Sequence, residues 1–446
     1  MKKLIIFFCA FVLTKAGLFS QTISLEQVRV LALANSRSLA KVTLSLKSSN
    51  LNEKEQLFSM LPNISAGYSA SMDYLNRDWD FVNPIDTFKA GINLEITQTI
   101  FNGGKSFIQK AINKIATESV RKDALAEYFN TLDSADNAYY AVLEAAATLE
   151  AEESSLQTAL SSLAIAEIRQ ASGMINPGDY LKALADRESR ENSRNQARRN
   201  LSLNKMKLRS ITGLEELPAP EMIDFSGYEN LILYLGSISD QDADALYDRF
   251  WKILAAANPS LAKSALSRQR AEKSLSLARR DYTPVISASV FSTGLNYSTA
   301  DGFGTTSGGG VSIRGSIPLD FWVMSNKIEK SKIALESASL DYISAEIQLE
   351  TDLQDALIRT FNQSGSFLSS RRSLDYAEKH FEYVMERYRL AQSSISDLEE
   401  ASSLLINNRN NHIRAQYGFL QSLSRLRSLG AIDDEERLVR ILMGNL

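Results

Sequence analysis

Residues 88–110 read FKAGINLEITQTIFNGGKSFIQK, and they join a strand pattern to a helix pattern within 23 residues. From Phe88 to Thr97, apolar and polar residues alternate with period two, which is typical of a β-strand with one apolar and one polar face. After Gly103 and Gly104, neither glycine nor proline occurs from Lys105 to Ser172. At 1.5 Å per residue, these 68 residues predict about 100 Å of helix.

The elements around this junction follow from the same patterns. Residues 64–74 also alternate, so residues 64–97 form a hairpin across a loop that contains Trp79 and Pro84. A helix over about 25–60 precedes the hairpin and ends before Pro62, because proline cannot continue a helix. Apolar residues recur every seven positions in the long helix, which indicates coiled-coil packing. A turn at Gly173 to Gly178 leads to a returning helix that ends near Ile211.

The same order of elements occurs a second time, 222 residues later. Matches at this offset are Leu39-Ala40-Lys41 with Leu261-Ala262-Lys263, Pro62 with Pro284, and Ile64-Ser65-Ala66 with Ile286-Ser287-Ala288. The predicted second set is a helix over about 246–280, a hairpin with a bulge between Val290 and Phe291, a long helix, a turn at Ser393 to Ser396 and a helix to about Leu429. The second turn, counted from Ser393 to Ala401, is two residues shorter than Gly173 to Ala183. The predicted divisions are a first repeat over 21–212, a linker over 213–244, a second repeat over 245–430 and a tail over 431–446.

The N-terminus predicts export. Two lysines follow Met1, ten apolar residues run from Leu4 to Leu13, and small residues come next, so residues 1–20 are interpreted as a signal peptide. The chain has one cysteine, Cys9, and two histidines, which excludes a disulfide framework and a Cys/His zinc site. Its net charge of −4 argues against non-specific binding of nucleic acid.

The two hairpins leave two interpretations open. They could form a sheet that packs on a soluble core. Alternatively, four strands from each of several chains could close a transmembrane barrel, because the smallest barrels have about eight strands. The signal peptide, the duplication and the long helices favour the barrel. In that arrangement the apolar residues of the first hairpin are predicted to face lipid, namely Ile64, Ala66, Tyr68, Ile92 and Leu94.

Three short stretches resemble the TolC-type outer membrane efflux protein family, and the order of elements does so over the whole mature chain. The first helix carries Leu25-Glu26-Gln27 and Ala32-Leu33-Ala34-Asn35, echoed by residues 255–261. The strand end Gln98-Thr99-Ile100-Phe101-Asn102-Gly103-Gly104-Lys105 is similar to the family's Q-x-L-F-D-G-G-R. The turn from Gly173 to Leu181 is similar to its G-x-x-S-x-x-D-x-L. The second repeat departs from this pattern, because Pro318-Leu319-Asp320 stands where the paired glycines would be.

The resemblance implies a fold and a function. The fold is a mixed one, in which a homotrimer builds a 12-stranded transmembrane β-barrel and a long α-helical coiled-coil barrel, with an equatorial region from the linker and tail. The function is a passive exit duct in the outer membrane for tripartite efflux or type I secretion. Its partners would be a periplasmic adaptor, an inner-membrane transporter and outer-membrane lipid. The alternative is a periplasmic coiled-coil scaffold or adhesin without a channel. No enzyme motif, cofactor site or metal site is predicted.

In that family, acidic side chains surround the periplasmic entrance of the tunnel. The matching positions are Asp179 in the first turn and Asp397 and Glu400 in the second, which predicts a cation-favouring gate. Asp397 and Glu400 are three residues apart and would share a helix face. The competing explanation is helix capping, because carboxylates are favoured at helix N-termini in any protein.

Overall fold

The structure is a computed structural model, and it describes residues 22–75, 85–298, 302–304 and 308–444. The predicted signal peptide and the loop with Trp79 and Pro84 lie outside these residues. The chain divides into two compact units. Unit 1 comprises the described residues within 1–40, 125–258 and 348–446, and unit 2 comprises those within 41–124 and 259–347. In the described residues, no helix is both long and apolar enough to cross a membrane.

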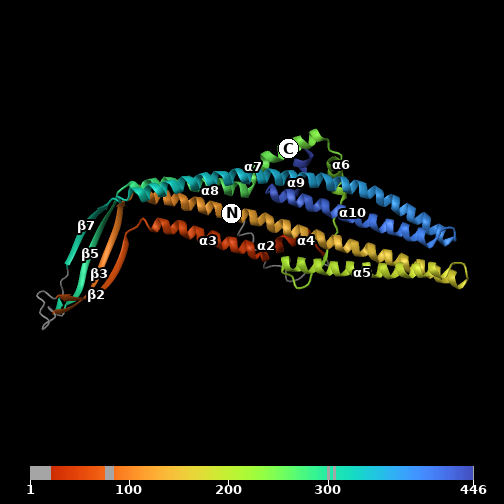
Figure 1. Cartoon of the computed structure of the whole chain (residues 1–446), viewed down its shortest axis with the longest axis horizontal. Helices are drawn as coiled ribbons and strands as arrows, with labels where there is room; N and C mark the ends of the chain where they lie inside the picture. The colour runs from red at the N-terminus through yellow and green to blue at the C-terminus, as the bar shows by residue number, and fades with distance from the viewer. Residues whose placement is uncertain (1–21, 76–84, 299–301, 305–307, 445–446) are drawn as a thin grey trace. The chain divides into compact units, whose positions relative to one another are not determined.

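Each repeat contains the predicted succession of helix, hairpin, long helix, turn and helix (Figure 1). The first consists of α2 (Leu25–Asn35), α3 (Arg37–Phe58), β2 (Asn63–Leu75), β3 (Ile85–Phe101), α4 (Lys105–Ala171) and α5 (Pro177–Thr212). The second consists of α7 (Asp240–Ala257), α8 (Pro259–Arg279), β5 (Val285–Ser298), β6 (Gly302–Gly304), β7 (Gly308–Ser316), α9 (Phe321–Arg389) and α10 (Ile395–Leu429). The compact units cut across these repeats, since each unit takes segments from both.

The first helix of each repeat is broken, contrary to the single helices predicted over about 25–60 and 246–280. Ser36 separates α2 from α3, and Asn258 separates α7 from α8, again at an offset of 222 residues. Both residues have extended backbone. At the second break, Pro259 is the first residue of α8 and lacks the N–H that a continuous helix would use.

An asparagine near each break binds the end of the returning helix of the same repeat. Asn35 Nδ2 donates to the carbonyl oxygens of Ser210 and Ile211 at 3.2 Å, at the end of α5. Asn258 Nδ2 donates to the carbonyl oxygen of Leu429, the last residue of α10, at 3.0 Å. The last carbonyls of a helix have no partner inside the helix, so each asparagine satisfies a group that is otherwise unpaired.

Unit 2 contains a sheet that is four strands wide. β2 pairs with β3, β3 pairs with β5, and β5 pairs along its other edge with β6 and β7, all antiparallel. The predicted return strand is thus divided, and its regular part ends at Ser316. The register places Ile64, Ile96, Val290 and Val311 in one row across all four strands. Ser65, Glu95, Phe291 and Gly310 form the neighbouring row on the opposite face.

The bulge in β5 lies further along the strand than predicted. Pairing with β3 shifts between Thr293 and Asn296, not between Val290 and Phe291. Phe291 therefore stays on the polar face, where its ring covers Gly310. A Cβ atom at residue 310 would come within 2.7 Å of that ring. The absence of a side chain there, rather than a change of face, accommodates the aromatic residue.

Linker and tail form helices in unit 1. The linker contributes α6 (Glu229–Gly236) and a short 3₁₀ turn at Ser226–Tyr228, and the tail contributes α11 (Glu435–Met443). A short parallel pairing joins β1 (Thr22–Ile23) to β4 (Ala219–Pro220). Both helices bury apolar residues, and Tyr228 in the linker donates a hydrogen bond to Glu435 in the tail.

A buried carboxylate joins three helices of unit 1, namely α2, α4 and α10. Asp136 on α4 is fully buried and accepts from Arg29 on α2 at 2.7 Å and from Arg427 on α10 at 2.6 Å. Removing one partner of such a group leaves a buried charge unpaired, so the cluster fixes the three helices more than it adds net stability.

Candidate functional site

Two helix turns in unit 1, which we call tip 1 and tip 2, carry the predicted gate residues. Tip 1 is residues 172–176, between α4 and α5, and tip 2 is residues 390–394, between α9 and α10. Both turns have five residues, so the prediction of a shortened second turn is wrong. The prediction took Ser393 as the start of the second turn, whereas the residue equivalent to Gly173 is Ala391.

The two tips share one backbone geometry. Gly173 and Ala391 both have positive φ, 71° and 61°. In tip 1 the N–H groups of Gly173 and Met174 donate to carbonyls of α4 at 3.0 and 2.8 Å. In tip 2 the N–H groups of Ala391 and Gln392 donate to the equivalent carbonyls of α9 at 3.0 and 2.8 Å. This left-handed ending satisfies the last carbonyls of each helix.

Asp179 and Asp397 occupy the same position in the two returning helices. Asp397 Oδ2 accepts from Ser394 N at 3.0 Å, and Ser394 Oγ accepts from Asp397 N at 3.1 Å, which completes a capping box. At tip 1, Asn176 caps α5, and its amide donates to Asp179 at 3.0 Å. The hydrogen bonds from Ser394 lower the pKa of the Asp397 carboxyl. Both aspartates therefore have a capping role in the folded chain.

Glu400 differs from the two aspartates. It lies one turn further along α10, its side chain is exposed, and it has no ion-pair partner in the described part of the chain. Two of the three predicted gate residues thus cap helices. The third, Glu400, is exposed and does not take part in a cap.

A buried side chain that no sequence pattern predicted joins the two tips. Arg169, near the end of α4, is 9% exposed and donates to the carbonyl oxygen of Tyr388 on α9. Its guanidinium carbon also lies 4.5 Å from the centre of the Tyr388 ring, a cation–π contact. Burial raises the pKa of the Tyr388 hydroxyl, and the charge of Arg169 opposes that rise. The signal in the sequence is weak, because residues 163–171 read LAIAEIRQA and also contain Glu167 and Gln170.

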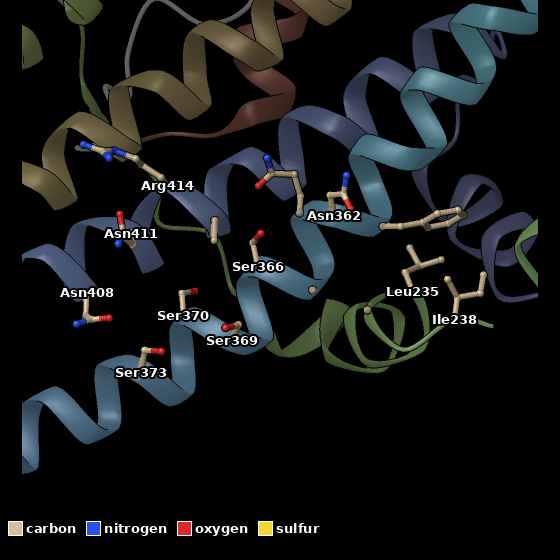
Figure 2. A pocket seen from close by; sticks show the side chains of 15 residues that line it. Leu235, Ile238, Asn362, Ser366, Ser369, Ser370, Ser373, Asn408, Asn411 and Arg414 are labelled. Carbon is tan, nitrogen blue, oxygen red and sulfur yellow. The ribbon is translucent and has the colours of Figure 1, made fainter. Parts of the chain in front are cut away.

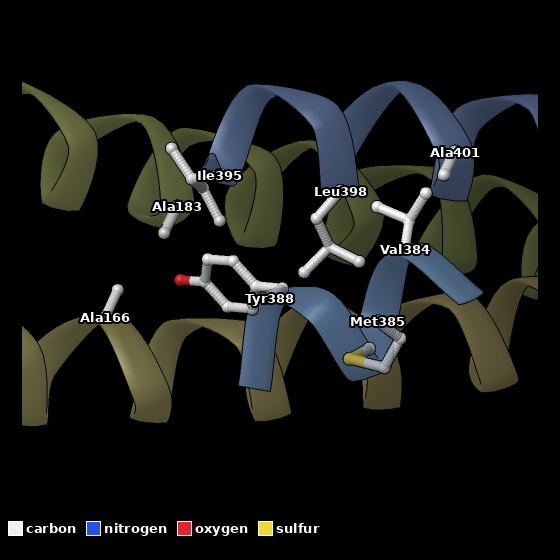
Figure 3. Packing of buried hydrophobic residues seen from close by; sticks show 8 residues of the cluster. All are labelled: Ala166, Ala183, Val384, Met385, Tyr388, Ile395, Leu398 and Ala401. Carbon is white, nitrogen blue, oxygen red and sulfur yellow. The ribbon is translucent and has the colours of Figure 1, made fainter. Parts of the chain in front are cut away.

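Apolar packing surrounds this contact (Figure 3). Tyr388 lies among side chains from all four helices, and small residues on α4 and α5 leave room for its ring. The cluster is Ala166, Ala183, Val384, Met385, Tyr388, Ile395, Leu398 and Ala401. Polar contacts also join α5 to α10, where Lys182 donates to Ser396 at 3.1 Å and Arg190 donates to Ser403 at 2.8 Å.

Two polar atoms at this cluster have no hydrogen-bond partner among the described residues. They are the Tyr388 hydroxyl and Oε1 of Glu399, and both are buried. Burial raises the pKa of the Glu399 carboxyl, the charges of Asp186 and Asp179 raise it further, and Lys182 and Arg190 oppose the rise. An unpaired buried polar atom costs free energy, so these two atoms lower the stability of the packing at the tips.

A polar groove of about 820 Å³ lies elsewhere in unit 1, between α9 and α10 (Figure 2). Its lining is rich in serine and asparagine, including Ser366, Ser369, Ser373, Asn408 and Asn411. Ser370 lies in its wall, and its hydroxyl is 3.1 Å from Nδ1 of His412. Within the described residues, no three Asp, Glu, His or Cys side chains are grouped so as to hold a metal ion.

The sheet of unit 2 places the five predicted lipid-facing residues on one face. Ala66 is opposite Leu94 and Tyr68 is opposite Ile92, while Ile64 is opposite Ile96. All five are exposed in the single chain. The other face is dominated by hydroxyl and small residues, and Ser289 and Ser312 are joined there at 2.8 Å.

Comparisons with known proteins agree with this geometry. The family model described as "Outer membrane efflux protein" matches residues 28–214 and 252–431. No curated protein matches the chain. The outer membrane channel CmeC of Campylobacter jejuni has a similar structure, with TM-score 0.75, 16% identity, and 95% of this chain and 89% of that chain covered. The outer membrane protein VceC of Vibrio cholerae is similar with TM-score 0.74, 16% identity and coverages of 91% and 96%.

At such identities the solved structures show the fold, while the family model covers most of the sequence in two blocks that correspond to the two repeats. The family consists of passive channels and not of enzymes. The chain therefore belongs to the outer membrane efflux protein family, as a channel of the outer membrane that extends into the periplasm and not as a scaffold or adhesin without one.

Proposed function

We propose that three copies of the chain form the conducting channel, which passes substrates from the periplasmic side to the outside. The observation that carries this proposal is the sheet of unit 2. Its order leaves one edge of β2 and one edge of β7 without a strand partner among the described residues. Free edges of long strands are avoided in stable proteins, and a barrel removes them. If β2 of each copy pairs with β7 of the next copy, three sheets of four strands close a barrel of twelve strands.

The faces of the sheet support the same arrangement. The row Ile64, Ile96, Val290 and Val311 would continue around the barrel as an apolar belt in contact with lipid. β2 and β3 have 13 and 17 residues, and a tilted strand needs about 9–11 to cross a membrane. The hydroxyl-rich face would line an aqueous lumen. The repeat boundaries, 21–212 and 245–430, belong to this proposal, with one hairpin and one tip from each repeat.

A passive duct needs partners that supply work. We place the channel with a periplasmic adaptor and an energised inner-membrane transporter, in tripartite efflux or in type I secretion. The tips of the long helices are where cargo would enter.

The gate forms the second part of the proposal. With three copies, Asp397 and Glu400 would place up to six carboxylates around the entrance, with Asp179 nearby. Such a ring would favour cations and would bind divalent ions.

The channel proposal is tested by single-channel recording. Purified protein in planar bilayers should conduct and should have a trimeric mass in mild detergent. Leu94→Arg should cost about 2–4 kcal/mol in the membrane and impair assembly, whereas Asn93→Arg, on the other face, should be tolerated. Conductance by a monomer, or equal damage from both arginines, would contradict the arrangement.

The gate is tested by separating charge from capping. Glu400→Gln removes charge without touching the cap, and Asp397→Ala with Glu400→Ala removes both carboxylates. Reversal potentials in a salt gradient should show a weaker cation preference for both variants, and weaker block by periplasmic divalent ions. Asp375→Asn, an exposed carboxylate on α9, is the control. If capping is the whole role, Asp397→Ala lowers stability by about 0.5–2 kcal/mol and selectivity stays unchanged.

A further inference from the structure

A phenylalanine interrupts the polar face of the sheet in unit 2. Phe291 on β5 is 39% exposed, on a face that otherwise carries mainly hydroxyl and small residues. Its Cζ, Cε1 and Cε2 atoms lie 2.7–3.4 Å from the position that a Cβ atom would take at Gly310 of β7. One side of the ring therefore rests on the glycine, which is a structural use, while the exposed surface of the ring remains available to a ligand.

A carboxylate stands beside this ring. Glu95 on β3 is the direct cross-strand neighbour of Phe291 on the same face, and the Cβ atoms of such neighbours are roughly 4.5–5.5 Å apart. Thr97 Oγ1 donates to Glu95 Oε1 at 3.2 Å, and no ion pair neutralises the carboxylate in the described part of the chain. At 3.3 Å per residue, Arg314 is about 13 Å along β7 from Gly310. The negative charge beside the ring is therefore uncompensated.

Small residues surround the pair and leave space above the sheet. β7 begins with three glycines, Gly308 to Gly310, and two of them share the face of the ring. In the next row on the other side, Ser289 is paired with Ser312. The ring and the carboxylate are thus the large side chains on a floor of glycine and serine, which a ligand can approach from above.

An organic cation is the ligand that uses both groups. The face of an aromatic ring attracts cations, and quaternary ammonium ions are typical ligands of such faces. The carboxylate adds an attraction that reaches about 8 Å at physiological ionic strength. A neutral aromatic molecule would gain nothing from the carboxylate, and an anion would be repelled by it. A small inorganic ion would have to lose bound water to contact the ring.

We propose that Glu95 and Phe291 form a binding site for organic cations on the wall of the channel, one site in each copy. The inference rests on the proposed function, because the polar face lines a lumen only in the barrel, and it names a class of cargo that the channel favours. The site is distinct from the predicted gate, since the gate residues belong to unit 1 and this pair belongs to unit 2.

Calorimetric titration of the full-length protein in mild detergent tests the site. The probe is benzyltrimethylammonium, and the uncharged comparison is benzyl alcohol, which has the same ring. The cation should bind once per chain and at least tenfold more tightly than the alcohol. Glu95→Gln and Phe291→Leu should each weaken binding of the cation by about fivefold. Leucine is chosen because it keeps an apolar cover over Gly310.

Two matched variants control for charge and for aromatic surface. Glu336→Gln removes an exposed carboxylate of α9 that has no ion-pair partner in the described part of unit 2. Tyr68→Leu removes an exposed ring from the opposite face of the same sheet. Both variants should bind the cation as the unmodified protein does.

Thiol labelling locates the site in the lumen. The only cysteine of the chain lies in the predicted signal peptide, so an introduced cysteine is alone in the mature protein. Ser65→Cys places a thiol opposite Glu95. In liposomes, a methanethiosulfonate that carries a trimethylammonium group should modify this thiol faster than an uncharged one, and Glu95→Gln or Phe291→Leu should remove the preference. Ile64→Cys, on the lipid-facing side, should not react.

The outcomes separate this inference from the channel proposal. Equal binding of the alcohol, or binding that neither Glu95→Gln nor Phe291→Leu weakens, would overturn the site, whereas a conducting trimer would leave the channel intact. Binding that depends on both residues in a protein that does not conduct would retain the site and contradict the proposed function. A reactive Ile64→Cys with an unreactive Ser65→Cys would overturn both.

Discussion

Tip 1 and tip 2 have the same backbone hydrogen bonds but different side chains. Tip 1 uses Gly173 at the left-handed position and Asn176 followed by Pro177 to start its returning helix. Tip 2 uses Ala391 at the left-handed position and a capping box between Ser394 and Asp397. The difference shows that the shape of the turn is specified by its hydrogen-bonding pattern, and that each repeat satisfies that pattern with its own residues. Tip 2 has the more strained backbone, because alanine and not glycine occupies its left-handed position.

The largest effect is expected where the tips touch each other. Arg169→Ala removes a charged hydrogen bond and a cation–π contact at a buried position, which should cost about 3 kcal/mol locally. Hydrogen exchange of amides in both tips should accelerate by about 100-fold. Arg187→Ala is the control, because its ion pairs lie on the surface and such pairs contribute about 1 kcal/mol or less. Faster exchange in one tip only would mean that Arg169 does not couple them.

The next largest effect is expected at the helix caps of the two tips, which should lose different amounts of stability when the N-cap is removed. Ser394→Ala at tip 2 and Asn176→Ala at tip 1 each remove an N-cap, which costs about 1 kcal/mol. We expect the larger loss at tip 1, because Asn176→Ala removes both side-chain bonds to Asp179, whereas Ser394→Ala keeps the backbone N–H that donates to Asp397. Exchange rates in the first turns of α10 and α5 measure both. Equal losses would show that the bond from the Asn176 amide to the Asp179 carboxylate adds nothing beyond the single cap.

Exchanging the left-handed residues should bring the two tips closer together in stability. Ala391→Gly relieves the strain of a Cβ atom at positive φ and should stabilise tip 2 by about 1 kcal/mol. Gly173→Ala should destabilise tip 1 by a similar amount, although the described residues beyond its chain neighbours place no atom within 4 Å of the added Cβ position. The local exchange rates should therefore shift in opposite directions. A shift in the same direction would mean that strain at φ is not what separates the tips.

The smallest effect is a pH dependence confined to tip 2. The Asp397 carboxyl has a lowered pKa, so its stabilisation is complete above the ordinary value of 3.8 and is lost as the pH falls through the folded value. The Glu399 carboxyl has a raised pKa, so its contribution is favourable below 4.5 and is lost as the pH rises through the folded value. Glu399→Gln should remove the second trend and leave the first. Exchange in α10 between pH 3 and pH 7 tests both signs.

The sequence predicted the elements well because their signals are long. A 67-residue helix without glycine or proline, and strands with strict alternation, leave few alternatives. The helix breaks at Ser36 and Asn258 were missed because periodicity continues across them. The bulge was misplaced by a few residues because Phe291 was assigned to the apolar face from its hydrophobicity alone.

The candidate site could be predicted only in part. Asp179 and Asp397 were found because the two turns resemble the family's motif, and their capping was foreseen because carboxylates are favoured at helix starts. Arg169 and Tyr388 are 219 residues apart in sequence, and their contact depends on the packing of four helix ends, which no local pattern records. Glu399 was passed over for the same reason, since its raised pKa comes from burial at that packing.

The asparagines Asn35 and Asn258 have a consequence for how the chain can be cut. Each one ties the beginning of a repeat to the last turn of that same repeat, so each repeat is closed by its own contact and does not need the peptide between residues 213 and 221 to hold its ends together. A polypeptide opened at that segment would become two fragments, each retaining a helical tip and a strand hairpin. Two such fragments, synthesised separately, should recognise one another through the pairing of β3 with β5 and reconstitute the subunit.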